Sequence, residues 1–154
     1  MNKNTKKVFA ITHNVAAACA GMVADMQVLV RQVTALSRIR KLEIRRDVAT
    51  NSIAKLMSVI MFERRYFPLL TQVVVGGTDP SPQIYTLDPL GSLLPDDYAA
   101  VGTGAEMALG VLDSEYKKDI SIDVARNLAV KAIKSSIQRC LLYTSPSPRD
   151  VEES

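Results

Sequence analysis

Apolar and polar residues alternate at the start of the chain. Within residues 7–11, Lys7, Phe9 and Ile11 fall on one face of an extended segment and the residues between them on the other. Residues 12–14, Thr-His-Asn, follow as a tight turn. The pattern predicts a β-strand that ends in a turn.

A second, apolar strand is expected over residues 15–20, which are small. Gly21 then stands where the backbone must bend into a helix, and Asp25 falls in the first turn of that helix. A backbone N–H at such a junction can point at an oxyanion. We therefore expect Gly21 to be chemically important.

The remaining pattern predicts two helices, a group of strands and two more helices. The expected helices span residues 22–46, 48–64, 105–116 and 122–139, and the expected strands span residues 69–75, 83–87, 92–94 and 98–101. Asp47 and Ser121 are the expected N-caps of the second and fourth helices. The last helix is expected to bury Ala125, Leu128, Ala129, Ala132 and Ile133. Hairpin connections between the central strands favour a mainly antiparallel α/β protein.

Composition narrows the class of protein. The chain has 154 residues, 47% of them hydrophobic, and a net charge of +3, which fits one globular domain. Two cysteines make no disulfide framework, and Cys19 in an apolar strand is expected to be a reduced, buried thiol in a cytoplasmic protein. Residues 37–46 are strongly basic, and without aromatic platforms we interpret them as a solvated face or a subunit contact, with no nucleic acid as partner.

Two other interpretations stay open at this point. The basic start followed by Ala18-Cys19-Ala20 mimics a secretory or lipoprotein signal, although the turn at residues 12–14 interrupts the apolar run, which is shorter than the roughly 18 residues of a membrane span. The glycines of residues 102–104 lie between an expected strand and helix, as in a dinucleotide-binding motif, but the third glycine is missing. The sequence offers no metal constellation, and we expect no cofactor.

Several segments resemble a known family in order and spacing. They are residues 6–9, 20–25, 27–29, 66–68, 73–79, 85–91, 98–104 and 110–116. Together they resemble the β-subunits of the proteasome core particle, most closely the archaeal ones. The resemblance implies a four-layer αββα sandwich of the N-terminal-nucleophile hydrolase type. It also implies a threonine endopeptidase of ATP-dependent protein degradation, which works on unfolded polypeptides inside heptameric rings of β-subunits stacked on α-subunits.

The resemblance also assigns roles to residues. Lys7 matches the lysine that lowers the pKa of the nucleophile, Gly21 matches the residue whose N–H forms the oxyanion hole, and Thr103 stands where the family has a serine near the nucleophile. A substrate pocket is implied beside the scissile bond, lined by Thr5, Phe9, Cys19, Val23 and Gln27.

The ends of the chain carry expectations of their own. The nucleophilic threonine of the family would lie upstream of Asn2, so we expect the polypeptide as written to be an incomplete and inactive subunit. A non-catalytic ring subunit, either α-type or an inactive β, is the alternative. Residues 140–150 resemble a translated transposase adapter from sequencing libraries, which divides the chain into a partial β-subunit domain at 1–139 and a disordered tail at 140–154.

Overall fold

A computed structural model describes residues 6–143 of the chain, and these residues form two compact units that divide between Gly102 and Thr103. The elements are β1 (Val8–Ala10), β2 (Val15–Gly21), α1 (Val23–Ile44), α2 (Thr50–Glu63), β3 (Thr71–Gly77), β4 (Gln83–Leu87), β5 (Leu93–Asp96), α3 (Ala105–Glu115) and α4 (Ile122–Tyr143). The single domain expected over residues 1–139 stays a prediction.

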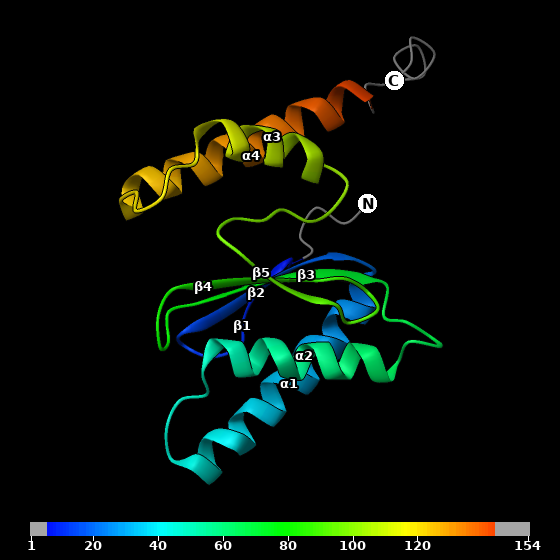
Figure 1. Cartoon of the computed structure of the whole chain (residues 1–154). Helices are drawn as coiled ribbons and strands as arrows, with labels where there is room; N and C mark the ends of the chain where they lie inside the picture. Colours follow the sequence, from blue (N-terminus) through cyan, green and yellow to red (C-terminus); the bar gives the residue numbers. More distant parts are fainter. Residues whose placement is uncertain (1–5, 144–154) are drawn as a thin grey trace. The chain divides into compact units, whose positions relative to one another are not determined.

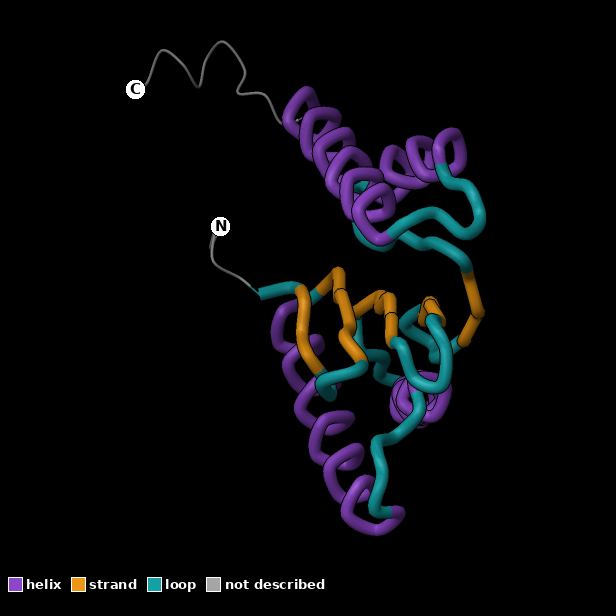
Figure 2. Tube along the Cα trace, turned by 90° about the vertical axis from the view of Figure 1, so that its left-hand side faces the viewer, coloured by secondary structure: helices purple, strands orange, loops and turns teal. Residues whose placement is uncertain are grey.

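The first unit is a five-stranded sheet with two helices on one face (Figures 1 and 2). The strands lie side by side in chain order, from β1 to β5, and every neighbouring pair is antiparallel. For β1–β2, β3–β4 and β4–β5 this follows from the short connections, because tight turns can join only antiparallel neighbours. The long α1–α2 segment separates β2 from β3, and its apolar sides cover the sheet.

The core lies between the sheet and these two helices. Alternate residues of β2 and β3 point into it, so that Ala17 and Val73, for example, are buried while Ala16 and Val74 are not. The helices supply the largest fully buried side chains, which are Met26, Leu29, Ile53, Met57 and Met61. The methionines are thus core residues, as their helical spacing indicates.

The other face of the sheet carries small and apolar residues that α1 and α2 do not cover. One row of partners across the strands consists of Val8, Ala18, Val74, Thr86 and Leu94. Val8 is 60% exposed and Leu94 is 61% exposed. In a four-layer sandwich this face packs against a second sheet, whereas the described residues contain one sheet.

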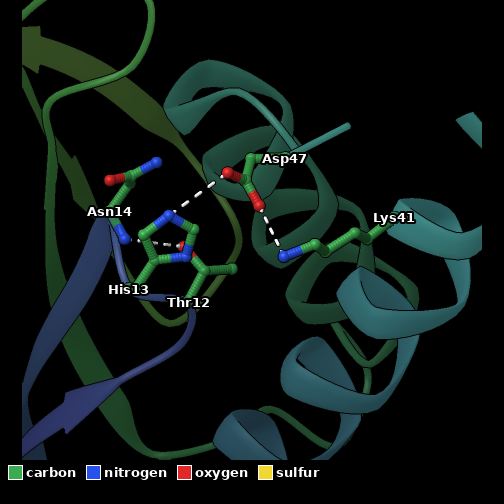
Figure 3. A network of polar contacts seen from close by, with 5 residues as sticks. All are labelled: Thr12, His13, Asn14, Lys41 and Asp47. Atoms are coloured by element: carbon green, nitrogen blue, oxygen red, sulfur yellow. Dashed lines mark hydrogen bonds and ion pairs between the residues drawn. The ribbon is translucent and has the colours of Figure 1, made fainter. Parts of the chain in front are cut away.

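The prediction for Asp47 is wrong. Helix α2 begins at Thr50, and its N-cap is Ala49, which makes no side-chain capping bond. Asp47 instead lies in the connection before it, where one carboxylate oxygen is 2.8 Å from the Lys41 ammonium and the other is 3.2 Å from Nε2 of His13 (Figure 3). These contacts occupy both carboxylate oxygens, and they join the α1–α2 connection to the β1–β2 turn.

The expected strand over residues 98–101 is also wrong, because this segment is irregular. The apolar content of a short run does not make a strand without a neighbouring strand to bond, and the described part of the sheet ends at β5. The other strands match their predictions within a few residues, and β4 spans residues 83–87 as expected.

The second unit is an antiparallel pair of helices, α3 and α4. Ser121 caps α4 as predicted, since its hydroxyl accepts a hydrogen bond from the N–H of Val124 at 3.3 Å. Leu128 and Ala132 are buried. The prediction is wrong for Ala125, Ala129 and Ile133, which are exposed because one helix, α3, covers only part of the apolar side of α4 within this unit.

Helix α4 also passes the expected boundary at residue 139 and continues to Tyr143. Residues 140–143 are Cys-Leu-Leu-Tyr, and their helix propensity is similar to that of the residues before them. The first proline after the helix is Pro146. The expected boundary at residue 139 and the expected tail stay predictions, and residues 144–154 lie outside the described residues.

The mixed α/β class expected from the sequence is confirmed. Antiparallel strands, paired helices on one face of a sheet and a second pair of helices appear in the predicted chain order. The chain order agrees with the sandwich that the resemblance implies, and the described residues supply one of its two sheets.

Candidate active site

Lys7 and Gly21 lie at the same end of the sheet, on neighbouring strands. The N–H of Cys19 donates a hydrogen bond of 2.9 Å to the carbonyl of Lys7, which extends the β1–β2 register by one pair beyond Val8 and Ala18. Lys7 is therefore opposite Cys19, and Gly21 is two residues further along the same strand. Because paired residues and alternate residues share a face, Lys7 and Gly21 both belong to the face that carries Cys19.

The direction of the Gly21 amide follows from the same ladder. In an antiparallel strand, N–H groups point alternately to the two neighbouring strands. Since the N–H of Cys19 points to β1, the N–H of Gly21 is directed toward the same side, past the start of β1. Lys7 and the Gly21 amide thus lie at the same end of β1 and β2.

Glycine is required at position 21 by two independent features. Its φ of +135° is a conformation that residues with a side chain rarely adopt. A Cβ atom there would also lie 2.1 Å from the carbonyl oxygen of Leu70. The strand end at Gly21 consequently touches the backbone that leads into β3.

Leu70 is fixed from both sides at this contact. Its carbonyl accepts a hydrogen bond from the N–H of Met22 at 2.8 Å. Its own N–H donates to Oδ2 of Asp25 at 2.7 Å. The carboxylate in the first turn of α1 therefore holds the start of β3 against the junction between β2 and α1.

The expected pocket residues fall into three groups. Phe9 is half-buried against the core and Cys19 is buried within it. Val23 and Gln27 lie one turn apart near the start of α1, and both are exposed. Thr5 lies outside the described residues. The structure thus brings Phe9 and Cys19 together on paired strands beside Lys7 and Gly21.

Cys19 is a free, buried thiol, as the sequence predicts. Burial raises the pKa of Cys19 to about 11, against a smaller opposite effect of a hydrogen bond with Thr71. The thiol is therefore protonated at neutral pH and acts as an apolar side chain.

Thr103 begins the second unit and is exposed. The grouping described for Lys7 and Gly21 rests on the first unit alone, so the role of Thr103 beside them stays a prediction.

The glycines of residues 102–104 have structural explanations. A Cβ atom at Gly104 would lie 2.8 Å from Cβ of Ser136, and the carbonyl of Gly104 accepts a hydrogen bond of 3.0 Å from the hydroxyl of Ser136. Gly104 therefore lets the start of α3 approach α4. Gly102 has a φ of +103°. Helix packing and a turn account for both glycines, and this disfavours the nucleotide-binding interpretation.

Sequence reasoning missed two contributors to this region. Leu70 reads as an ordinary strand residue, and nothing in its surroundings along the chain indicates the contact with Gly21. Lys6 places a second cation nearby, with its ammonium 5.7 Å from the centre of the Phe9 ring. The sequence feature that could have indicated Lys6 is the pair of adjacent lysines shortly before an aromatic strand residue.

The described residues offer neither a metal site nor a membrane-spanning helix. Among residues 6–143, no group of three or more His, Cys, Asp or Glu side chains is arranged to hold a metal ion. Within the same range, every helix is too short or too polar to cross a membrane.

Comparison with known proteins gives long matches. A family model described as proteasome subunit matches residues 1–145. The chain is 60% identical over 139 residues to proteasome subunit beta 1 of Nitrosopumilus maritimus, which covers 90% of this chain and 70% of that protein. It is also 60% identical over 139 residues to proteasome subunit beta 1 of Cenarchaeum symbiosum, covering 72% of that protein. Identity to proteasome subunit beta 2 of Pyrobaculum aerophilum is 47% over 135 residues, with 87% of this chain and 66% of that protein covered.

Proposed function

The chain belongs to the proteasome subunit family, and from this premise we propose that it is a β-subunit of the proteasome core particle. Subunits of this type are hydrolases that cleave peptide bonds with a threonine nucleophile. In this proposal the chain takes part in the degradation of unfolded polypeptides as a threonine endopeptidase.

One observation carries the catalytic part of the proposal. Lys7 pairs with Cys19 across the β1–β2 ladder, and Gly21 lies two residues away on the same face. In this arrangement the ammonium of Lys7 favours the deprotonated form of a nucleophile placed between the two groups. The N–H of Gly21 donates to the oxyanion of the tetrahedral intermediate.

The substrate side is assigned to the same edge. Phe9 and Cys19 form the apolar floor of the pocket, and the exposed Val23 and Gln27 form its rim. By the family resemblance, Thr5, which lies outside the described residues, is assigned to the same pocket, and Thr103 is assigned to assist the nucleophile. This composition favours cleavage after hydrophobic side chains.

The proposed contact with other subunits is inferred from the exposed second half of α1. Leu36, Ile39 and Leu42 are 44%, 54% and 80% exposed, and they lie among the arginines and lysines of residues 37–46. Apolar side chains in a basic surface suit a contact with another subunit better than a solvated face. We assign this surface to ring assembly with α-subunits, in a cytoplasmic particle that contains no nucleic acid or membrane partner.

The experiment uses the full-length subunit assembled with its α-subunits. Hydrolysis of a fluorogenic peptide with a hydrophobic residue before the reporter is measured for the wild type, Lys7→Ala and Lys55→Ala. Lys7→Ala should lower kcat by at least about 100-fold. Lys55 is an exposed lysine of α2 away from this edge, and its variant should retain wild-type kcat. Equal activity of all three particles would refute the assignment of Lys7.

The expected inactivity of the 154-residue polypeptide stays a prediction. The purified polypeptide, tested in the same assay, should release no fluorophore above the buffer rate. Hydrolysis that disappears in its Lys7→Ala variant would contradict this expectation.

A further inference from the structure

Asp25 lies close to the candidate oxyanion hole without being part of it. Its carboxylate is in the first turn of α1, four residues after Gly21, and accepts the N–H of Leu70 at 2.7 Å. A carboxylate and a backbone amide form a charge-assisted hydrogen bond, which is stronger than a bond between neutral groups. This bond spans 45 positions of the sequence.

The bond acts on the residue that contacts Gly21. The carbonyl oxygen of Leu70 lies 2.1 Å from where a Cβ atom of Gly21 would be, and it also accepts the N–H of Met22. A shift of Leu70 therefore moves the peptide group that follows Gly21. Thr71, the next residue, pairs with Gly21 in the β2–β3 register, so the same shift also reaches the strand end that carries the Gly21 amide.

We propose that Asp25 is a positioning residue for the oxyanion hole. By holding Leu70, it fixes the orientation of the Gly21 amide toward the transition state. This inference rests on the proposed function, because it assumes that the Gly21 N–H stabilises an oxyanion. Asp25 itself touches neither substrate nor nucleophile in this mechanism.

The chain offers a matched control in Asp88. Its Oδ1 accepts the N–H groups of Leu90 and Ser92 at 2.9 and 3.0 Å, so it too is a carboxylate that fixes a loop by backbone hydrogen bonds. It follows β4, two strands away from β2, which corresponds to about 10 Å. Removing Asp88 should affect stability and leave the Gly21 amide in place.

The test compares the wild type with Asp25→Ala, Asp25→Asn and Asp88→Ala in the full-length subunit assembled with its α-subunits. Three quantities are measured: kcat and KM for a fluorogenic peptide, affinity for a peptide boronate, and affinity for the corresponding unreactive peptide amide. The boronate forms a tetrahedral adduct whose oxygen needs the oxyanion hole. The amide needs only the pocket.

Asp25→Ala should lower kcat by about 10- to 100-fold, with a similar loss of boronate affinity. KM and the affinity for the peptide amide should stay near their wild-type values. Asp25→Asn keeps an oxygen acceptor without the charge and should lose about two- to fivefold in kcat and boronate affinity. Asp88→Ala should lower the melting temperature and leave kcat unchanged.

Three results would overturn the inference. They are wild-type kcat in Asp25→Ala, equal losses of kcat in Asp25→Ala and Asp88→Ala, and a loss of boronate affinity matched by the peptide amide. If Asp25→Ala does not assemble, Asp25→Asn decides: a parallel loss of about twofold or more in kcat and boronate affinity supports the inference, and wild-type values reject it. A wild-type particle without any peptidase activity would instead reject the proposed function.

Discussion

The substitution Gly21→Ala gives the sharpest test of the geometry at the end of β2. The new methyl group would lie 2.1 Å from the Leu70 carbonyl oxygen and 2.9 Å from the Cα of Thr71. Both neighbours are backbone atoms, which cannot rotate away as a flexible side chain would. The β2–β3 ladder must therefore open locally, or the methyl group must force the whole strand end to shift.

Two terms contribute to the expected loss of stability. A residue with a side chain at a φ of +135° costs about 1–3 kcal/mol in backbone conformation. Displacing packed backbone costs about 1–3 kcal/mol more, as in other overpacked sites. We expect the free energy of unfolding to fall by about 2–6 kcal/mol in total, measured by urea titration of the full-length subunit.

Gly76→Ala is the matched control, because Gly76 lies in the same sheet and its Cβ atom would meet only the carbonyl of Gln83 at 4.0 Å. This variant should lose no stability and can gain up to about 1 kcal/mol through the lower entropy of its unfolded chain. A Gly21→Ala variant as stable as Gly76→Ala would refute the close contact between Gly21 and Leu70.

Three further predictions concern other parts of the first unit. The hydrogen bond from Lys41 lowers the pKa of Asp47 in the folded protein. This pair therefore stabilises the fold above the ordinary aspartate pKa, and the stabilisation disappears as the pH falls. Below about pH 4, the urea midpoint of the wild type should drop more steeply than that of Asp47→Asn. Burial raises the pKa of Cys19 to about 11, so iodoacetamide at pH 8 should label Cys19 only after denaturation, as measured by mass spectrometry of its peptide. Leu29→Ala in the buried side of α1 should cost about 2–5 kcal/mol in unfolding free energy, whereas Leu42→Ala on its exposed side should cost about 0.5 kcal/mol or less.

The sequence predicts elements well where the physical cause is local. Helical spacing of Met26, Leu29 and Val33 places α1, and all three side chains are buried as this spacing requires. Ser121 caps α4 because its hydroxyl needs only a nearby amide. The face shared by Lys7 and Phe9 follows from alternation along one short strand.

Prediction fails where contacts made by the folded chain compete with a pattern along the sequence. Asp47 has the residue type of an N-cap, but Lys41 and His13 reach it through the folded structure. Asp25 looks like a first-turn acid that favours the helix dipole, and only the fold reveals its bond with Leu70. Residues 98–101 have the composition of a strand, yet a strand also depends on a neighbour that composition does not specify.

In the candidate site, too, local features could be predicted from the sequence and long-range pairing could not. The bend at Gly21 could be predicted from the change of period along the chain. The register that sets Lys7 opposite Cys19 could not, because alternation fixes a face and leaves open which residues of two strands are paired.

The position of Gly21 within β2 has a consequence for motion. The strand is bonded on one side to β1 and on the other to β3, and its inner side chains reach the centre of the core. Many enzymes carry their oxyanion donors on loops that open and close, whereas here the donor ends a strand that is bonded on both sides. Hydrogen exchange at the neighbouring amide of Met22, which is bonded to the carbonyl of Leu70, should therefore be slow, so that the backbone that carries the Gly21 amide keeps its position between turnovers.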